Sequence, residues 1–167
     1  KHPKDSWTFD KLLKNSWCNE QDAAMIRNMI HERKNILMIG ATGTGKTSVL
    51  RSILAELPQD ERVVIIEDSA EVAEPNSASV RLLTRYDSSE ILRTITLADL
   101  VRQSLRMRPD RVIVGEVRGG EAKDLLMALA TGHSGSAGTL HASDPHQALI
   151  RLEMLIQMGA PNWSLEA

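Results

Sequence analysis

Gly40-Ala41-Thr42-Gly43-Thr44-Gly45-Lys46-Thr47 decides the fold of this chain, because it matches the pattern G-x-x-x-x-G-K-[ST] at every position. A short apolar run at residues 35–39 leads into this segment, and a predicted helix at residues 46–57 follows it until Pro58. A strand, a glycine-rich turn and a helix in this order place successive backbone N–H groups around an anion at the positive end of the helix. The segment therefore predicts a P-loop that holds the phosphates of ATP.

The residue types in the loop have expected roles in nucleotide binding. The ε-ammonium group of Lys46 is expected to reach the β- and γ-phosphates, and the hydroxyl group of Thr47 is expected to bind Mg²⁺. The alternative is a glycine-rich turn that only joins a strand to a helix, which the complete match and its context make the weaker interpretation. The predicted nucleotide-binding residues are Gly40, Ala41, Thr42, Gly43, Thr44, Gly45, Lys46, Thr47 and Ser48.

Outside the loop, buried strands alternate with amphipathic helices. Strands are predicted at residues 35–39, 62–66, 112–114 and 136–140, with a weaker one at residues 80–84. The predicted helices are residues 19–33, 46–57, 120–131 and 144–159 and a helix that begins at residue 96. We expect Leu149 to face the core, and Gly132 and Gly159 to end their helices. This alternation is typical of an α/β fold with a mainly parallel sheet flanked by helices.

The composition excludes several classes of protein. The chain has 167 residues, of which 42% are hydrophobic and 25% charged, which is the profile of one folded, soluble domain. A net charge of −2 and an aromatic content of 3% argue against a nucleic-acid motor, which needs a basic channel and stacking aromatics. The single cysteine, Cys18, cannot form an internal disulfide, which indicates a reducing compartment. The sequence also lacks an apolar run of the roughly 20 residues that a membrane span requires.

Acidic residues follow two of the predicted strands. Glu116 follows the strand at residues 112–114, at the place where a carboxylate can hold Mg²⁺ or its water; the alternative is an exposed loop acid. Glu67, Asp68 and Glu71 follow the strand at residues 62–66, and this group is expected to include the residue that orients the attacking water. Spacing alone does not choose among these three, and each can instead be a solvated surface acid.

Two histidines, His133 and His141, flank the strand at residues 136–140. A histidine near a γ-phosphate can donate a hydrogen bond to it and report hydrolysis to a neighbouring subunit. Taken alone, each is explained equally well as a structural histidine. A metal site is a weak interpretation, because no cysteine or carboxylate cluster shares their spacing.

Four motifs, taken in order, resemble those of the bacterial type II/type IV secretion ATPases, the motors of secretion systems and pili. Residues 40–47 resemble their Walker A loop, residues 67–71 (EDSAE) are similar to their Asp box, and residues 105–122 (LRMRPDRVIVGEVRGGEA) look like their extended Walker B motif. Residues 131–133 (TGH) and 139–142 (TLHA) look like their His box. The Walker B stretch leans toward the tight-adherence pilus (CpaF-like) and conjugation branches, and the whole resemblance covers roughly residues 20–160.

This resemblance implies a RecA-like P-loop NTPase core that hydrolyses ATP with Mg²⁺ as part of a homohexamer. It implies that Glu71 is the catalytic glutamate that polarises water, acting with Lys46, and that Glu116 holds Mg²⁺ through water. It also implies that His133 and His141 sense or contact the γ-phosphate.

Arginines of the core are further candidates. Arg85 and Arg118 are among those that could face a neighbouring subunit's phosphates or pair with acids of the Asp box. Ordinary structural ion pairs explain each of them at least as well.

The resemblance also predicts how the chain is organised and what it serves. Residues 1–18 are expected to be a linker or a short helix at the entrance to the domain, and residues 19–167 a C-terminal RecA-like ATPase domain. The N-terminal domain and the C-terminal end of the full-length protein are expected to lie outside this chain.

The implied partner is an inner-membrane platform protein of a secretion or pilus machine, with no direct contact to nucleic acid. The implied location is the cytoplasm, peripherally associated with the bacterial inner membrane. The alternatives are a RecA-like nucleic-acid motor and a nucleotide-gated scaffold without turnover; intact Lys46, Glu71 and Glu116 argue against the scaffold.

Overall fold

A five-stranded sheet forms the centre of the computed structural model, which describes residues 7–86 and 93–163. All of its strand pairs are parallel, and the strand order is β1-β5-β4-β2-β3. The predicted parallel sheet is confirmed, including its weaker strand. The strands are β1 (Ile36–Ile39), β2 (Val63–Glu67), β3 (Val80–Leu83), β4 (Arg111–Val114) and β5 (Ala137–Leu140).

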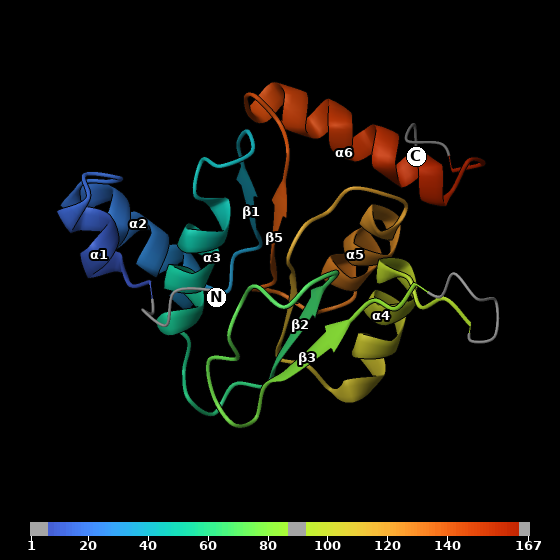
Figure 1. Cartoon of the computed structure of the whole chain (residues 1–167), viewed down its shortest axis with the longest axis horizontal. Coiled ribbons are helices and arrows are strands. Elements are labelled where there is room, and N and C mark those ends of the chain that lie inside the picture. The colour runs from blue at the N-terminus through green and yellow to red at the C-terminus, as the bar shows by residue number, and fades with distance from the viewer. Residues whose placement is uncertain (1–6, 87–92, 164–167) are drawn as a thin grey trace.

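Helices cover both faces of this sheet (Figure 1). The first three helices pack on one face and the last three on the other, and a short 3₁₀ turn at Leu105–Met107 leads into β4. Within the described residues, none of the helices is long and apolar enough to cross a membrane. The helices are α1 (Phe9–Lys14), α2 (Glu20–His31), α3 (Lys46–Ala55), α4 (Leu97–Ser104), α5 (Glu121–Ala130) and α6 (Pro145–Gly159).

The predicted segment at residues 1–18 is described only in part. Residues 9–14 form α1, whose Phe9 and Leu12 are buried in the core, so this part is a helix that packs on the domain. Residues 1–6 of the segment lie outside the described residues, as do residues 87–92 of the irregular stretch after β3 and residues 164–167.

Strand β2 shows why the sheet is covered on both sides. Val63 and Ile65 belong to the apolar cluster under α1, α2 and α3, whereas Val64 and Ile66 belong to the cluster under α4, α5 and α6. An uninterrupted apolar run is what a strand buried on two faces requires, in contrast to the alternation of a half-exposed strand. Each fully buried isoleucine contributes about 1.5–3 kcal/mol to folding relative to an exposed one.

Capping boxes start two of the helices. At α4, the hydroxyl group of Thr96 accepts the N–H of Asp99 at 3.2 Å, and Oδ2 of Asp99 accepts the N–H of Thr96 at 3.1 Å. Hydrogen bonds from the Thr96 backbone and hydroxyl, followed by one from Arg102, lower the pKa of Asp99 to about 2. Asn19 and Asp22 form the same arrangement at α2.

The predicted inward face of α6 is wrong at Leu149. Leu149 is 67% exposed, because α6 turns Ala148, Leu155 and Ile156 inward and the next position along the chain is rotated away from that face. Gly159 ends α6 as predicted, but as its last helical residue and not in a left-handed turn, and a Cβ atom there would clash with the carbonyl oxygen of Gly120. The glycine is needed for close packing against the start of α5. Gly132, in contrast, does follow the end of α5 with φ +102°, as predicted.

Candidate nucleotide site

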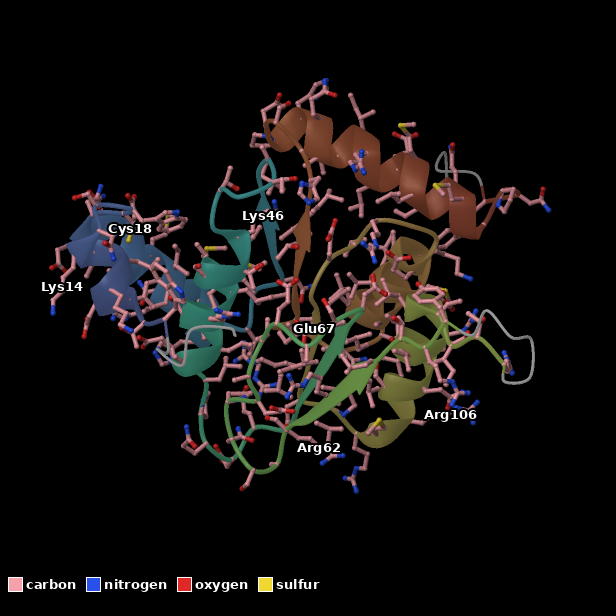
Figure 2. All side chains as sticks on the ribbon, in the orientation of Figure 1. Lys14, Cys18, Lys46, Arg62, Glu67 and Arg106 are labelled. Atoms are coloured by element: carbon pink, nitrogen blue, oxygen red, sulfur yellow. The ribbon has the colours of Figure 1, made fainter. Side chains whose placement is uncertain are left out.

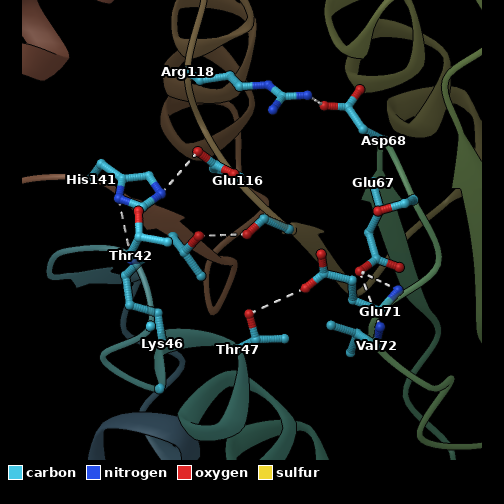
Figure 3. Close-up of a pocket in the computed structure, with 15 residues that line it drawn as sticks. Thr42, Lys46, Thr47, Glu67, Asp68, Glu71, Val72, Glu116, Arg118 and His141 are labelled. Carbon is cyan, nitrogen blue, oxygen red and sulfur yellow. Dashed lines mark hydrogen bonds and ion pairs between the residues drawn. The ribbon is translucent and has the colours of Figure 1, made fainter. Parts of the chain in front are cut away.

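A cleft of about 390 Å³ opens at the edge where the carboxyl ends of β2, β4 and β5 meet the loop after β1 (Figure 3). Parallel strands place all their carboxyl ends at one edge, and ligands of open α/β sheets bind there. Figure 2 places Lys46 and Glu67 near the middle of the molecule and Arg106 on its outer surface. The lining residues are Thr42, Gly43, Gly45, Lys46, Thr47, Glu67, Asp68, Ser69, Glu71, Val72, Gly115, Glu116, Arg118, Thr139 and His141.

The loop between β1 and α3 has the conformation expected of an anion cradle. Gly43 and Gly45 have φ values of +78° and +91°, in the left-handed region that side chains rarely adopt. Gly45 caps α3 without a side-chain hydrogen bond. The first N–H groups of a helix have no partner inside the helix, so those of α3 can bind an anion at its positive end.

Lys46 lies over the mouth of this loop. Its Nζ donates to the carbonyl oxygens of Gly40 at 2.9 Å and Ala41 at 2.7 Å, and it lies 3.5 Å from Nδ1 of His141. Thr44 closes the loop with a hydrogen bond from its hydroxyl group to Ala41 at 2.8 Å. Gly40, Ala41 and Thr44 thus shape the loop, whereas Thr42, Gly43, Gly45, Lys46 and Thr47 line the cleft and Ser48 does not.

The predicted acids reach the loop from two other motifs. The hydroxyl group of Thr47 donates to Oε2 of Glu71 at 3.4 Å. Oε1 of Glu116 lies 3.3 Å from Nε2 of His141, so that histidine stands between Glu116 and Lys46 (Figure 3). The structure therefore brings together all five of these predicted residues.

The three acids of the Asp box lie in three different environments. Glu71 is exposed, whereas Glu67 is 4% exposed and accepts the N–H groups of Glu71 and Val72. Burial raises the pKa of Glu67 above its usual value. Asp68 accepts the hydroxyl group of Thr84 at 2.8 Å and forms an ion pair with Arg118.

Of the two arginine candidates, one lines the cleft and the other lies outside it. Arg118 lines the cleft and joins the segment after β4 to the segment after β2 through its pair with Asp68. Arg85 is exposed outside the cleft: its backbone pairs with Ile95, and its guanidinium group donates to the carbonyl oxygen of Arg93 at 3.1 Å.

His133 is not brought to the cleft. It precedes β5, whereas His141 follows β5, so the two histidines lie at opposite edges of a parallel sheet. Its Nδ1 lies 3.2 Å from the carbonyl oxygen of Ala128 at the end of α5. A contact between His133 and a γ-phosphate would therefore require the site of another subunit.

Two polar residues of the cleft, Ser69 and Thr139, are not among the predicted site residues, and Glu67 is predicted only as one of three loop acids. The hydroxyl group of Thr139 donates to the carbonyl oxygen of Gly115 at 2.6 Å and links the ends of β5 and β4. A threonine next to the end of a predicted strand was the available signal for it. The predicted strand ends at residue 66 and leaves Glu67 among the loop acids, whereas β2 continues through Glu67.

The oxygen atoms of the cleft fit a magnesium ion that is bound together with nucleotide. Thr47, Glu71 and Glu116 supply hydroxyl and carboxylate oxygens, the hard ligands that Mg²⁺ prefers. Among residues 7–86 and 93–163, no group of three or more His, Cys, Asp or Glu side chains is arranged to hold a metal ion by itself. Mg²⁺ usually keeps several waters and takes other ligands from substrate phosphates, which this donor set allows.

Comparison with known proteins agrees with this geometry. Residues 3–167 match the family described as Type II/IV secretion system protein. The chain is 46% identical over 137 residues to a putative conjugal transfer protein of Mycobacterium tuberculosis, covering 82% of this chain and 39% of the relative. It is 40% identical over 156 residues to the conjugal transfer protein TrbB of Rhizobium radiobacter, covering 92% of this chain and 45% of TrbB.

A solved structure extends the comparison to three dimensions. The VirB11 ATPase from the Brucella suis type IV secretion system, in complex with sulphate, superposes with a TM-score of 0.75 at 30% identity. The match covers 95% of this chain and 45% of that protein, so the chain spans less than half the length of these relatives. With the family match running over nearly all of its residues, the chain belongs to the type II/IV secretion system protein family, and its fold is a RecA-like P-loop core.

Proposed function

We propose that the full-length protein binds Mg-ATP at the loop of residues 40–47 and hydrolyses it in the adjoining cleft. One observation carries the proposal: residues from four separate motifs, namely Lys46, Thr47, Glu71, Glu116 and His141, line a single cleft. Together they supply a cation for phosphates, oxygens for a metal ion, a carboxylate for water and an imidazole for the γ-phosphate.

In this proposal the loop and its neighbours bind the nucleotide. The backbone N–H groups at the start of α3 hold the phosphates, and Lys46 exchanges its bonds to Gly40 and Ala41 for the β- and γ-phosphate oxygens. Thr47 and Glu116 would hold Mg²⁺, Thr47 through its hydroxyl group and Glu116 through a water molecule. A bound Mg²⁺ would supply positive charge that neutralises the phosphates.

Glu71 then orients the attacking water and accepts its proton. Its position favours this role, because its Oε2 lies 3.4 Å from the hydroxyl group of Thr47, the proposed metal ligand of the phosphate loop. His141 contacts the γ-phosphate from the opposite side, between Lys46 and Glu116.

ATP hydrolysis would power the transfer of a macromolecular substrate through a cell-envelope machine. Two of the relatives are named as conjugal transfer proteins and the structural neighbour belongs to a type IV secretion system, which favours conjugative transfer or protein secretion. Pilus assembly, as in the tight-adherence (CpaF-like) branch, is the related alternative, supported by the Walker B stretch at residues 105–122.

The working form proposed for the full-length protein is a homohexamer on the cytoplasmic side of the bacterial inner membrane. There it would bind a platform protein of the machine and would not contact nucleic acid directly. The family membership supports these expectations, and the net charge of −2 supports the last of them.

Mg²⁺-dependent release of phosphate from ATP by the purified full-length protein tests the proposal. Glu71→Gln and Glu116→Gln should each abolish turnover, and Glu71→Gln should still bind nucleotide. Glu74→Gln is the matched control, because Glu74 belongs to the same loop but pairs with Arg81 outside the cleft. Turnover that survives both cleft substitutions would refute the assignment, and turnover that depends on added DNA would favour a nucleic-acid motor instead.

A further inference from the structure

Glu67 is a buried carboxylate that lines the cleft, and only one of its two oxygens accepts hydrogen bonds. Its Oε1 accepts the N–H of Glu71 at 3.3 Å and the N–H of Val72 at 3.1 Å. Its Oε2 is buried and, among the described residues, has no hydrogen-bond partner. Buried polar atoms are nearly always paired, so an unpaired oxygen on a buried acid calls for an explanation.

The hydrogen-bonded oxygen, Oε1 of Glu67, fixes the main chain that carries Glu71. The side chain of Glu71 is exposed, so packing does not determine where it lies. Val72, the next residue, is 1% exposed and belongs to the core cluster under α1, α2 and α3. The turn that presents Glu71 to Thr47 is therefore anchored at three points: the carboxylate of Glu67, the core contact of Val72, and the guanidinium group of Arg51, which donates to the carbonyl oxygen of Glu71.

The opposite side of Glu67 lies against the end of β4. A Cβ atom at Gly115 would lie 2.9 Å from Cγ of Glu67 and 3.4 Å from its Oε1, so the glycine makes room for this side chain. Gly115 also donates its N–H to Ile66 at 2.9 Å, accepts the hydroxyl group of Thr139 and directly precedes Glu116. Glu67 thus fills the space between the segment that carries Glu71 and the segment that carries Glu116.

Space filling alone does not explain this arrangement. An isosteric apolar side chain would fill the same space without burying an unpaired oxygen, but it could not accept two backbone N–H groups. The feature that the position requires is an acceptor aimed at residues 71 and 72.

We propose that Glu67 is a positioning residue for ATP hydrolysis, which sets the place of Glu71 by accepting the N–H groups of Glu71 and Val72 and by resting on Gly115. Its role is to accept hydrogen bonds, and neither its charge nor a proton transfer at its free oxygen is required. For the reaction itself this inference rests on the proposed function, whereas the anchoring of residues 71 and 72 can be measured without turnover.

Three variants of the full-length protein test the proposal. Glu67→Ala removes the acceptor and should lower kcat by about 10²-fold, as displacement of a catalytic group by about 1 Å does. The affinity for a fluorescent ATP analogue should stay within about twofold, because the phosphate loop is untouched. Glu67→Gln keeps an amide oxygen for the two N–H groups and should retain most of the turnover. Glu74→Ala, in the same loop but outside the cleft, should behave as wild type.

Hydrogen exchange provides the readout that does not depend on activity. In Glu67→Ala, the amides of residues 71 and 72 should exchange faster than in the wild type, while the hydrogen-bonded amides of residues 50–55 in α3 keep their protection. Faster exchange at residues 71 and 72 in Glu67→Gln, or unchanged exchange there in Glu67→Ala, would overturn the anchoring role.

The turnover results separate the two proposals. Inactive wild-type protein would overturn the proposed function alone, because hydrogen exchange at residues 71 and 72 would still test whether Glu67 anchors them. Active wild type with an equally active Glu67→Ala variant, or with a Glu67→Gln variant as impaired as Glu67→Ala, would overturn the positioning role. If Glu67→Ala does not fold, Gly115→Ala provides the test, since its methyl group would clash with Cγ of Glu67 and displace that side chain. It should lower kcat and speed exchange at residues 71 and 72, and normal values of both would overturn the proposal.

Discussion

The hydroxyl group of Thr47 donates a hydrogen bond to Oε2 of Glu71 at 3.4 Å, joining two motifs that are 24 residues apart in the chain. The first residue belongs to the phosphate loop and the second to the turn after β2. This contact places Thr47, the proposed metal ligand, beside Glu71, the carboxylate proposed to orient water.

The first prediction concerns Thr47. Thr47→Ala should weaken Mg²⁺-dependent nucleotide binding by about ten- to a hundredfold, because losing one strong polar contact to a charged group costs about 1.5–3 kcal/mol. Thr47→Ser keeps the hydroxyl group and should remain close to wild type. A Mg²⁺ titration of ATP turnover measures the effect, and a Thr47→Ala curve that overlays the wild type would contradict the metal role.

The second prediction separates the two arginines. Arg118→Ala should lower turnover by about tenfold or more, because a charged group in the cleft is removed, whereas Arg85→Ala should leave turnover within about twofold. The side chain of Arg118 is half exposed, so its loss should change the free energy of unfolding by less than about 1 kcal/mol. Steady-state kinetics and denaturant unfolding of both variants provide the check. Equal kinetic effects at both positions would rule out a specific role for Arg118.

The third prediction uses two glycines with similar backbone strain. Gly45→Ala and Gly132→Ala each force a side chain into the left-handed region and should each destabilise the chain by about 1 kcal/mol or more. Gly45 lines the cleft, whereas Gly132 follows α5 at the far edge of the sheet. We expect only Gly45→Ala to weaken nucleotide binding, as measured by titration with a fluorescent ATP analogue. Weakened binding in both variants would mean that global destabilisation is the cause.

The fourth prediction concerns the cap of α4. Hydrogen bonds lower the pKa of Asp99 to about 2 from its usual 3.8, so the folded state binds its proton less readily than the unfolded state. The resulting stability is present above pH 3.8 and is lost as the pH falls toward 2. Asp99→Asn should therefore cost about 1 kcal/mol at pH 6 and progressively less in acid. Urea unfolding at several pH values tests this, and a cost that is independent of pH would refute it.

The fifth prediction concerns Glu67, whose pKa burial raises above its usual 4.5. The folded state then holds this proton more tightly than the unfolded state, so the contribution to stability is full below pH 4.5 and falls as the pH rises through the raised pKa. Glu67→Gln cannot lose a proton, so its stability relative to the wild type should increase as the pH rises. Parallel pH series of denaturant unfolding measure this difference, and a constant difference would show that Glu67 titrates alike in both states.

Much of the fold was predictable because its signals are local. The run Val63–Ile66 is apolar without interruption, and residues 40–47 require a strand before them and a helix after them. Thr96 and Asp99 are three residues apart, so their capping box needs no knowledge of tertiary contacts. Parallel pairing then brings the ends of β2, β4 and β5 to one edge, where Glu116 and His141 line the cleft.

What could not be predicted depends on contacts between distant segments. Glu67 is buried because β2 continues by one residue and Gly115 leaves space beside it, 48 positions further along the chain. Gly159 has the sequence pattern of a helix stop, yet its role is set by Gly120 on another helix.

The contact between Gly120 and Gly159 also limits how α6 could move if nucleotide binds in the cleft as proposed. The helix begins at its cap Asp144, shortly after His141, and its far end rests on the segment that follows Arg118. Its 15 residues form a rod about 22 Å long, and a hydrogen-bonded helix does not shorten. Any change in the distance between those two supports must tilt the rod or part the glycines. Because Leu149 and Met154 are exposed on α6, a tilt would carry an event at the phosphates to the outside of the molecule as a movement of apolar side chains.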